Sequence, residues 1–117
     1  MRYANGVPSD LVEIIETKAF SRRIDELLGA EDYRLLQWYL VQRPDAGRVV
    51  PGSGGIRKLR WRVEGAGKRG GVRVAYYWHV GAAQLFFLYA FGKNEQHNLT
   101  PDQIKALRKT VEAEFRS

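Results

Sequence analysis

The sequence predicts an α+β fold: a small, antiparallel-rich sheet with two N-terminal helices and one C-terminal helix packed on one side of it. Three observations lead to this prediction. Apolar residues recur at helical spacing early in the chain, alternating strand patterns follow, and a strongly capped helix comes last. The 117 residues are one domain's length without an internal repeat, so we expect a single domain over residues 1–117.

The N-terminal half is expected to contain one strand and two helices. Residues 11–15 are a short apolar run typical of a strand, and a helix is expected from Thr17 until Gly29 ends it. A second amphipathic helix is expected over residues 31–43, where a proline stops it. Its apolar face is expected to comprise Leu35, Leu36, Tyr39 and Leu40. Pro, Gly and Ser then make residues 44–55 a turn-rich connector.

Three strands of a meander are expected next, over residues 56–63, 72–80 and 84–91. In the first strand, cations alternate with apolar residues, so the cations share one face. The third strand is nearly all apolar, as expected for a central strand covered on much of both faces. The last helix begins with a capping box formed by Thr100 and Gln103. Its buried stripe is expected to comprise Ile104, Leu107, Val111 and Phe115.

The positive charge is concentrated in one segment. The chain has a formal net charge of +6, and residues 56–80 hold seven lysines and arginines against Glu64 alone. A solubilising surface would mix both signs, so this segment favours a polyanionic partner, with nucleic acid first. The alternative is a solvated basic face.

Composition excludes several classes of protein. There is no cysteine, which excludes disulfide scaffolds, thiolate metal sites and cysteine nucleophiles. Two histidines are a poor set of metal ligands, so we expect neither a metal nor another cofactor. The longest apolar run, residues 85–91, is much shorter than the ~20 residues of a membrane helix. With no signal-like apolar segment near Met1, a cytoplasmic location without membrane contact is expected.

The two basic strands supply the first candidate site. If they pair as a hairpin, one face carries Lys58, Arg60, Arg62, Arg73, Tyr77 and His79. Several like charges on one open face cost stability, and a phosphate backbone would offset that cost. Tyr77 and His79 could stack on unpaired RNA bases. The alternative is that these two rings only cover the sheet.

Two loops supply further candidates. Residues 65–71 match a Gly-x-Gly-x-x-Gly pattern, but a strand follows instead of a helix, which excludes a dinucleotide site. They form either a cationic hairpin tip suited to phosphate or a loop of solvated charges. In residues 92–97, Lys93 is a candidate for proton transfer and Glu95 could orient Lys93 or an arginine; the alternative is a polar linker. The RNA-binding candidates are Arg57, Arg62, Lys68, Arg69 and His79.

Three motifs occur in a characteristic order. They are Gly54-Gly-Ile-Arg-Lys-Leu-Arg60, then Gly65-Ala-Gly-Lys-Arg-Gly-Gly-Val-Arg-Val-Ala-Tyr-Tyr77, then Tyr89-Ala-Phe-Gly-Lys-Asn-Glu95 with Leu99-Thr100. Together they resemble the RelE/ParE toxin superfamily, and within it the HigB-like toxins of type II toxin–antitoxin pairs. The resemblance covers about residues 11–115 and implies a RelE-like microbial ribonuclease fold.

The resemblance also implies an activity and partners. Such toxins are ribosome-dependent endoribonucleases (mRNA interferases): without a metal, the ribose 2′-OH attacks the adjacent phosphate and leaves a 2′,3′-cyclic phosphate. A cognate antitoxin, in this branch often a helix-turn-helix protein, binds and silences the toxin. Two alternatives stay open, because ParE-like relatives poison gyrase and a plain RNA-binding module would have no activity.

The first functional residues are carried over by matching motif positions. Lys58 and Arg60 match residues of the first basic strand that act in proton transfer or charge stabilisation. Arg73 matches an arginine that stabilises the phosphate. These three residues are therefore implied to act on the scissile phosphate.

Two positions depart from the family pattern. Asn94 stands where the family has a further arginine, and Lys93 beside it is a candidate replacement. A tyrosine that assists in RelE falls near Thr100, so Tyr77 or Tyr89 would have to substitute for it. The catalytic candidates are Lys58, Arg60, Arg73, Tyr77, Lys93 and Asn94.

Overall fold

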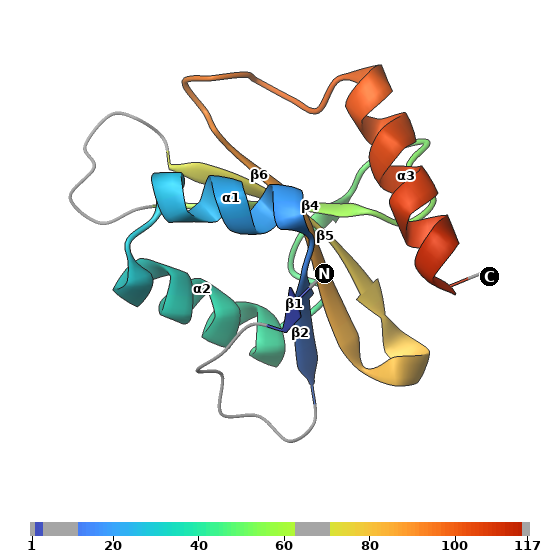
Figure 1. Cartoon of the computed structure of the whole chain (residues 1–117), viewed down its shortest axis with the longest axis horizontal. Coiled ribbons are helices and arrows are strands. Elements are labelled where there is room, and N and C mark those ends of the chain that lie inside the picture. Colours follow the sequence, from blue (N-terminus) through green and yellow to red (C-terminus); the bar gives the residue numbers. More distant parts are fainter. Residues whose placement is uncertain (1, 4–11, 63–70, 116–117) are drawn as a thin grey trace.

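A computed structural model describes residues 2–3, 12–62 and 71–115 (Figure 1). The elements are β1 (Arg2–Tyr3), β2 (Glu13–Glu16), α1 (Lys18–Leu27), α2 (Ala30–Gln42), β3 (Arg48–Val49), β4 (Arg57–Trp61), β5 (Val72–His79), β6 (Gln84–Gly92) and α3 (Pro101–Phe115). Within these ranges, six strands form one sheet in the order β1-β2-β6-β5-β4-β3. Neighbouring strands are antiparallel except β2 and β6, which are parallel. The predicted α+β class is confirmed, and the predicted elements occur in the expected order, with β1 and β3 in addition.

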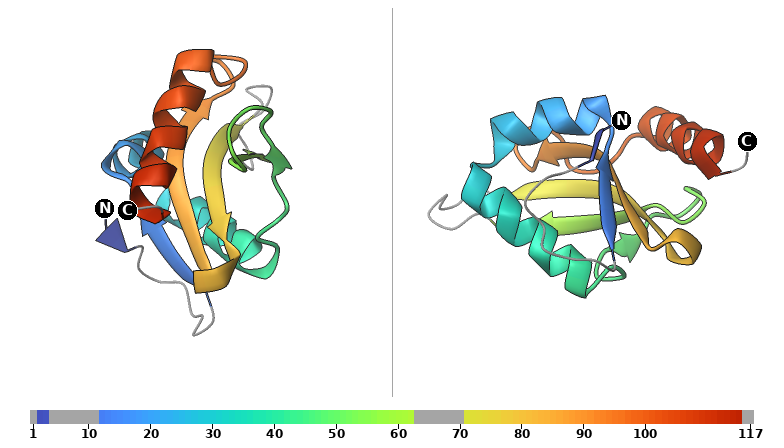
Figure 2. Two further views of the ribbon diagram at one scale, coloured as in Figure 1. Left: turned by 90° about the vertical axis from the view of Figure 1, so that its right-hand side faces the viewer. Right: turned by 60° about the horizontal axis from the view of Figure 1, so that its bottom comes forward.

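The sheet carries an apolar core on each of its two faces. The first core joins α1 and α2 to one side of β5 and β6, with Tyr76 and Phe87 among its members. The second core joins α3 to the alternate residues of the same strands, such as Ala75 and Phe86. The prediction that all helices pack on one side is therefore wrong for α3. Both faces of the apolar strand β6 need cover, and Figure 2 shows α3 lying apart from α2 across the twisted sheet.

The predicted starts of α1 and α3 are confirmed by their capping hydrogen bonds. The Oγ1 atom of Thr17 accepts a hydrogen bond of 3.0 Å from the N–H of Phe20 at the start of α1. At the start of α3, the Gln103 N–H donates to Thr100 Oγ1 at 3.1 Å, and the Thr100 N–H donates to Gln103 Oε1 at 2.9 Å. These bonds satisfy N–H groups that a helix leaves without internal partners. In the part of the chain described, no helix is long and apolar enough to span a bilayer.

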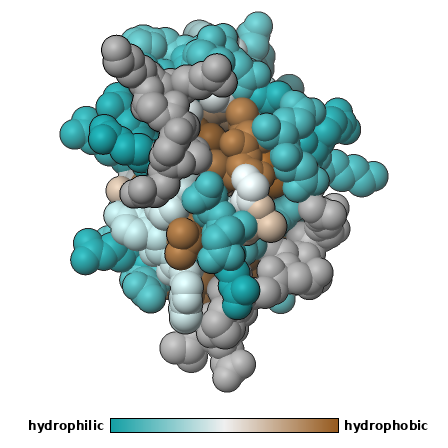
Figure 3. Space-filling model, turned by 90° about the vertical axis from the view of Figure 1, so that its left-hand side faces the viewer, coloured by the Kyte–Doolittle hydropathy of each residue, from teal (hydrophilic) through white to brown (hydrophobic). Residues whose placement is uncertain are grey.

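The buried face of α2 differs from the predicted one. Leu36 and Leu40 are buried as expected, but Leu35 is 48% and Tyr39 38% exposed, and Gln37 is buried instead. The helix is rotated so that its buried residues follow i, i+1 and i+4, while Leu35 faces solvent. Figure 3, which faces the side where α1 and α2 lie, shows hydrophobic surface exposed among hydrophilic side chains.

The predicted turn-rich connector contains a strand, β3, that the sequence analysis missed. Arg48 and Val49 pair with Lys58 and Arg57 at the edge of the sheet. The buried Ser53 holds the turn behind this strand: its hydroxyl donates to the Val50 carbonyl at 2.6 Å and accepts from the Ile56 N–H at 3.0 Å. The turn therefore folds the connector back onto β4 and brings Arg48 to the sheet.

Candidate functional site

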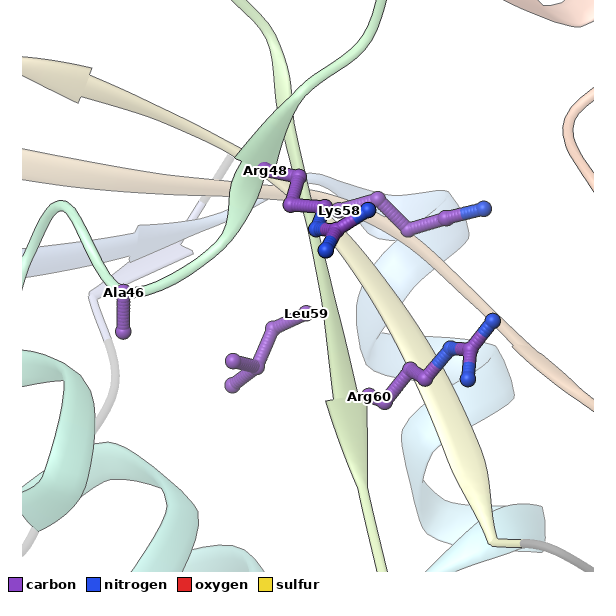
Figure 4. Close-up of a pocket in the computed structure, with 5 residues that line it drawn as sticks. All are labelled: Ala46, Arg48, Lys58, Leu59 and Arg60. Carbon is purple, nitrogen blue, oxygen red and sulfur yellow. The ribbon is translucent and has the colours of Figure 1, made fainter.

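Four cations gather on one face of the sheet, and we call them the basic cluster: Arg48, Lys58, Arg60 and Arg73. Arg48 is directly opposite Lys58 across β3 and β4, and Arg60 is directly opposite Arg73 across β4 and β5. Directly opposite side chains lie on the same face, within ~5 Å at Cβ. Figure 4 shows Arg48, Lys58 and Arg60 on one side of β4, with Leu59 and Ala46 on the other. Lys58, Arg60 and Arg73 thus share the face that the alternation predicted.

A hollow of about 410 Å³ lies at this edge of the sheet. It is lined by Ala46, Arg48, Lys58, Leu59 and Arg60. Three of these five residues are cations whose side chains extend from one side of β4, whereas Ala46 and Leu59 lie on its other side (Figure 4). The cations that border this hollow offer guanidinium and ammonium donors to an anion such as a phosphate group.

Lys58 stands at the centre of the cluster and has a perturbed pKa. Burial is the largest cause that lowers the pKa of Lys58 below its ordinary value of 10.5. The charges of Arg60, Arg73 and Arg48 lower this pKa further. The Lys58 ammonium donates a hydrogen bond of 2.6 Å to Oδ1 of Asn98. A lowered pKa increases the fraction of the neutral amine, the form of lysine that can take a proton from a substrate.

Arg60 and Arg73 form a pair of unequal exposure. Arg60 is exposed, whereas Arg73 is only 6% exposed, which differs from the open, solvent-facing arginine expected from the alternation. Burial, and next the charge of Arg60, lower the pKa of Arg73, yet an arginine stays protonated in proteins. The pair therefore offers one accessible guanidinium supported by a second one beneath the surface.

Tyr76 fixes the connector that carries Arg48. Its hydroxyl is buried, donates to the Pro44 carbonyl at 2.7 Å and accepts from the Gly47 N–H at 2.8 Å. Burial raises the pKa of Tyr76, against a lowering effect of the Gly47 N–H. Gly47 must stay small, because a Cβ there would lie 2.8 Å from the Tyr76 ring. The arrangement sets where β3 begins and so where Arg48 meets Lys58.

Replacing Tyr76 by Phe is expected to lower the free energy of unfolding by about 1–3 kcal/mol, because a buried N–H and a partly buried carbonyl lose their partner. Denaturant unfolding followed by circular dichroism measures this change. The matched control is Tyr39→Phe on the exposed face of α2, which is expected to stay within about 0.5 kcal/mol of the wild type. Equal stability of the two variants would contradict the role given to the Tyr76 hydroxyl.

Arg57 lies on the opposite face from the basic cluster. Its guanidinium donates to the carbonyls of Asp45 at 3.1 Å and Gly47 at 2.7 Å. Its pairing with Tyr76 places it on the side of the first core. The structure thus ties this RNA-binding candidate to the connector. Arg62 is exposed just beyond the end of β4.

Tyr77 and His79 pack under the C-terminal end of α3. The ring of Phe115 lies 5.4 Å from that of Tyr77 and 4.1 Å from that of His79, the latter nearly parallel at 17°. Nδ1 of His79 also accepts from the Ala82 N–H at 3.3 Å. Both rings share the face of Arg73 as predicted, but their contacts are with α3. Tyr89 of β6 also lies on this face, because it pairs with Ala75, which pairs in turn with Lys58.

Lys93 and Asn94 occupy the turn after β6, at the end of the sheet where β5 begins. Both are exposed, and the Lys93 N–H donates to the Gly71 carbonyl at 3.3 Å. The next residue, Glu95, orients an arginine and not Lys93: it pairs with Arg23 of α1. The Gly92 N–H, and then the Arg23 guanidinium, lower the pKa of Glu95.

Two predicted candidates, Lys68 and Arg69, lie outside the described residues. Two site residues were missed by the sequence analysis, namely Arg48 and Asn98. The signal for Arg48 was the Arg-Val-Val run before Pro51, which has strand propensity although it stands among turn residues. In residues 2–3, 12–62 and 71–115, no group of three or more His, Asp or Glu side chains could hold a metal ion.

The comparison with known families gives one match that spans nearly the whole chain. Residues 12–116 match the family described as the RelE toxin of the RelE/RelB toxin–antitoxin system. The match includes every residue of the basic cluster and all three helices.

Proposed function

The chain belongs to the RelE toxin family, and we propose that it is a ribosome-dependent endoribonuclease of the HigB-like kind that cleaves mRNA. Family membership makes it the toxin of a type II toxin–antitoxin pair. The observation that carries the finer proposal is Lys58, whose pKa is lowered within a cluster of three arginines. A surface that only held RNA would need the charges but no group poised for proton transfer.

In the proposed reaction, the scissile phosphate lies in the hollow lined by Arg48, Lys58 and Arg60. The neutral amine of Lys58 takes the proton of the ribose 2′-OH, whose oxygen attacks the adjacent phosphorus. The bond from phosphorus to the 5′-oxygen breaks, this oxygen takes up a proton from water, and the proton released by Lys58 neutralises the hydroxide that remains. The products are a 2′,3′-cyclic phosphate and a 5′-hydroxyl.

The arginines stabilise the negative charge that develops on the phosphate oxygens. Arg60 reaches the phosphate from the exposed side, and the buried Arg73 holds a second positive charge behind it. Charges fixed in place before the reaction stabilise the transition state without a cost of reorganisation. Lys93 and Asn94, at the end of β6, are proposed to contact the RNA next to this position, and Arg62, Lys68 and Arg69 to bind its backbone.

The family also implies a RelB-type antitoxin as partner. We propose that the antitoxin is a helix-turn-helix protein, and that mRNA on the ribosome is the target, which places the toxin in the cytoplasm. Gyrase poisoning is the competing outcome of the test below.

The proposal is tested by inducing the chain in bacterial cells, alone and with the gene next to it. Alone, it is expected to stop growth and to produce new mRNA 5′ ends within coding regions. With the neighbouring gene, growth is expected to recover and the two proteins to copurify. Arrest with intact mRNA and gyrase-linked DNA breaks would contradict the proposal and favour a gyrase poison.

A further inference from the structure

A second hollow lies on the other side of Lys58, between β3 and the start of α3. Its volume is about 500 Å³, within the range of about 300–1,000 Å³ of small-molecule sites. Its wall is aliphatic and comprises Val49, Val50, Pro51, Leu99 and Ile104. Arg48 and Lys58 line both this hollow and the first one, so the two are neighbours that share a cationic border.

One polar side chain stands at the boundary between the aliphatic wall and the cations. Asn98 lines the hollow, and its Oδ1 accepts the hydrogen bond of Lys58 at 2.6 Å. This bond fixes which end of the amide faces the lysine, so the NH₂ group is turned away from it. An amide in this position can hydrogen-bond the edge of a planar polar ring.

The aliphatic wall is exposed enough to receive a ligand. Val49 pairs with Arg57 and so alternates with Arg48 in facing. It is 52% exposed and lines the hollow at the edge of the sheet, while Ile104 is half-buried on α3. A ligand that matches all three features has an anionic group, a flat apolar face and a polar edge. A nucleotide has these features, with its phosphate on the shared cations and its base against the aliphatic wall.

We propose that this hollow binds the base of a nucleotide next to the scissile phosphate, and that Val49, Ile104 and Asn98 select that base. The inference rests on the proposed function, because it takes the RNA backbone to lie on the basic cluster. An acidic antitoxin segment could use the same cations, but the aliphatic wall beside the amide of Asn98 favours the base.

The test compares ligands that differ only in the base. Adenosine 5′-monophosphate, uridine 5′-monophosphate and ribose 5-phosphate are titrated into the wild-type protein, and the methyl signals of valine, leucine and isoleucine are followed by NMR. At least one nucleotide is expected to bind roughly tenfold more tightly than ribose 5-phosphate, since stacking of a base on a side chain contributes on this order. The signals of Val49 and Ile104 are expected to move with that nucleotide only.

Two matched variants locate the effect. Val49→Phe fills the hollow and is expected to remove the tenfold advantage of the nucleotide while ribose 5-phosphate binds as before. Val80→Phe is the same change at a residue that is 72% exposed on the turn between β5 and β6. It is expected to leave the affinities for the nucleotide and for ribose 5-phosphate unchanged. Both positions are exposed at the surface, so both variants are expected to fold.

Three results would overturn the inference. They are equal binding of all three ligands, methyl signals of Val49 and Ile104 that do not move, or a Val49→Phe variant that binds the antitoxin more weakly but binds the nucleotides as the wild type does. Failure of the proposed function is separate. Intact mRNA with wild-type protein, while the nucleotide still binds in the hollow, would contradict the cleavage proposal and leave the base site standing.

Discussion

Replacing Arg73 by Met is expected to reduce mRNA cleavage by about two to three orders of magnitude. The change removes the positive charge behind Arg60 and leaves an unbranched apolar side chain at a position that is only 6% exposed. Loss of one preorganised electrostatic contribution to a developing oxyanion typically costs ~3–4 kcal/mol of transition-state stabilisation. Arg73→Lys keeps a positive charge behind Arg60 and is expected to recover only part of the rate, since a lysine does not reproduce the planar donor geometry of a guanidinium. The measurement is single-turnover cleavage of mRNA on programmed ribosomes.

Two controls separate this effect from unfolding and from loss of charge in general. Circular dichroism and copurification with the antitoxin report whether Arg73→Met is folded. Arg34→Met, which removes an exposed arginine from α2, is expected to cleave like the wild type. Full cleavage by a folded Arg73→Met protein would contradict the role of Arg73.

Replacing Lys58 by Met is expected to reduce cleavage about a hundredfold, at the lower end of what general acid–base catalysis contributes. The wild-type rate is expected to rise with pH and then level off, because the neutral amine is the active form of the base. This rise is expected at a pH below the range in which an ordinary lysine titrates, because burial and the charges around Lys58 lower its pKa. The Lys58→Met variant is expected to lose the rise. The measurement is the cleavage rate as a function of pH.

A neighbouring variant tests the cause of that pH dependence. Arg60→Met removes one of the charges that lower the pKa of Lys58. The pKa of Lys58 then moves up, so the rise in rate is expected to shift to higher pH. A wild-type rate that falls as pH increases over the same range would show that Lys58 acts as an acid, and an unchanged profile in Lys58→Met would remove it from proton transfer.

Local rules of sequence predicted the parts of the fold that depend on near neighbours. The capping box of Thr100 and Gln103 depends on residues three apart, and its two hydrogen bonds are present. Alternation in β4 and β5 is equally local, so Lys58, Arg60 and Arg73 were placed on one face from the sequence.

The rest depends on contacts between distant parts of the chain. Arg48 joins the cluster because the Tyr76 hydroxyl holds Pro44 and Gly47, a contact over about thirty residues that no local pattern contains. The cover that α3 gives to Tyr77 and His79 depends on which face that helix takes, and an apolar stripe on a helix does not specify a face of the sheet. The hollow beside Asn98 arises where β3 meets α3.

The most direct test of the account is the chemistry of the cleaved RNA. Purified toxin is added to ribosomes programmed with a defined mRNA, and the new ends are identified by mass spectrometry. The proposed reaction leaves a 2′,3′-cyclic phosphate on the upstream fragment and a 5′-hydroxyl on the downstream fragment. These ends are expected at the wild-type rate with Arg34→Met and at a greatly reduced rate with Arg73→Met. Intact mRNA, or fragments that carry a 5′-phosphate and a 3′-hydroxyl, would contradict the proposed reaction.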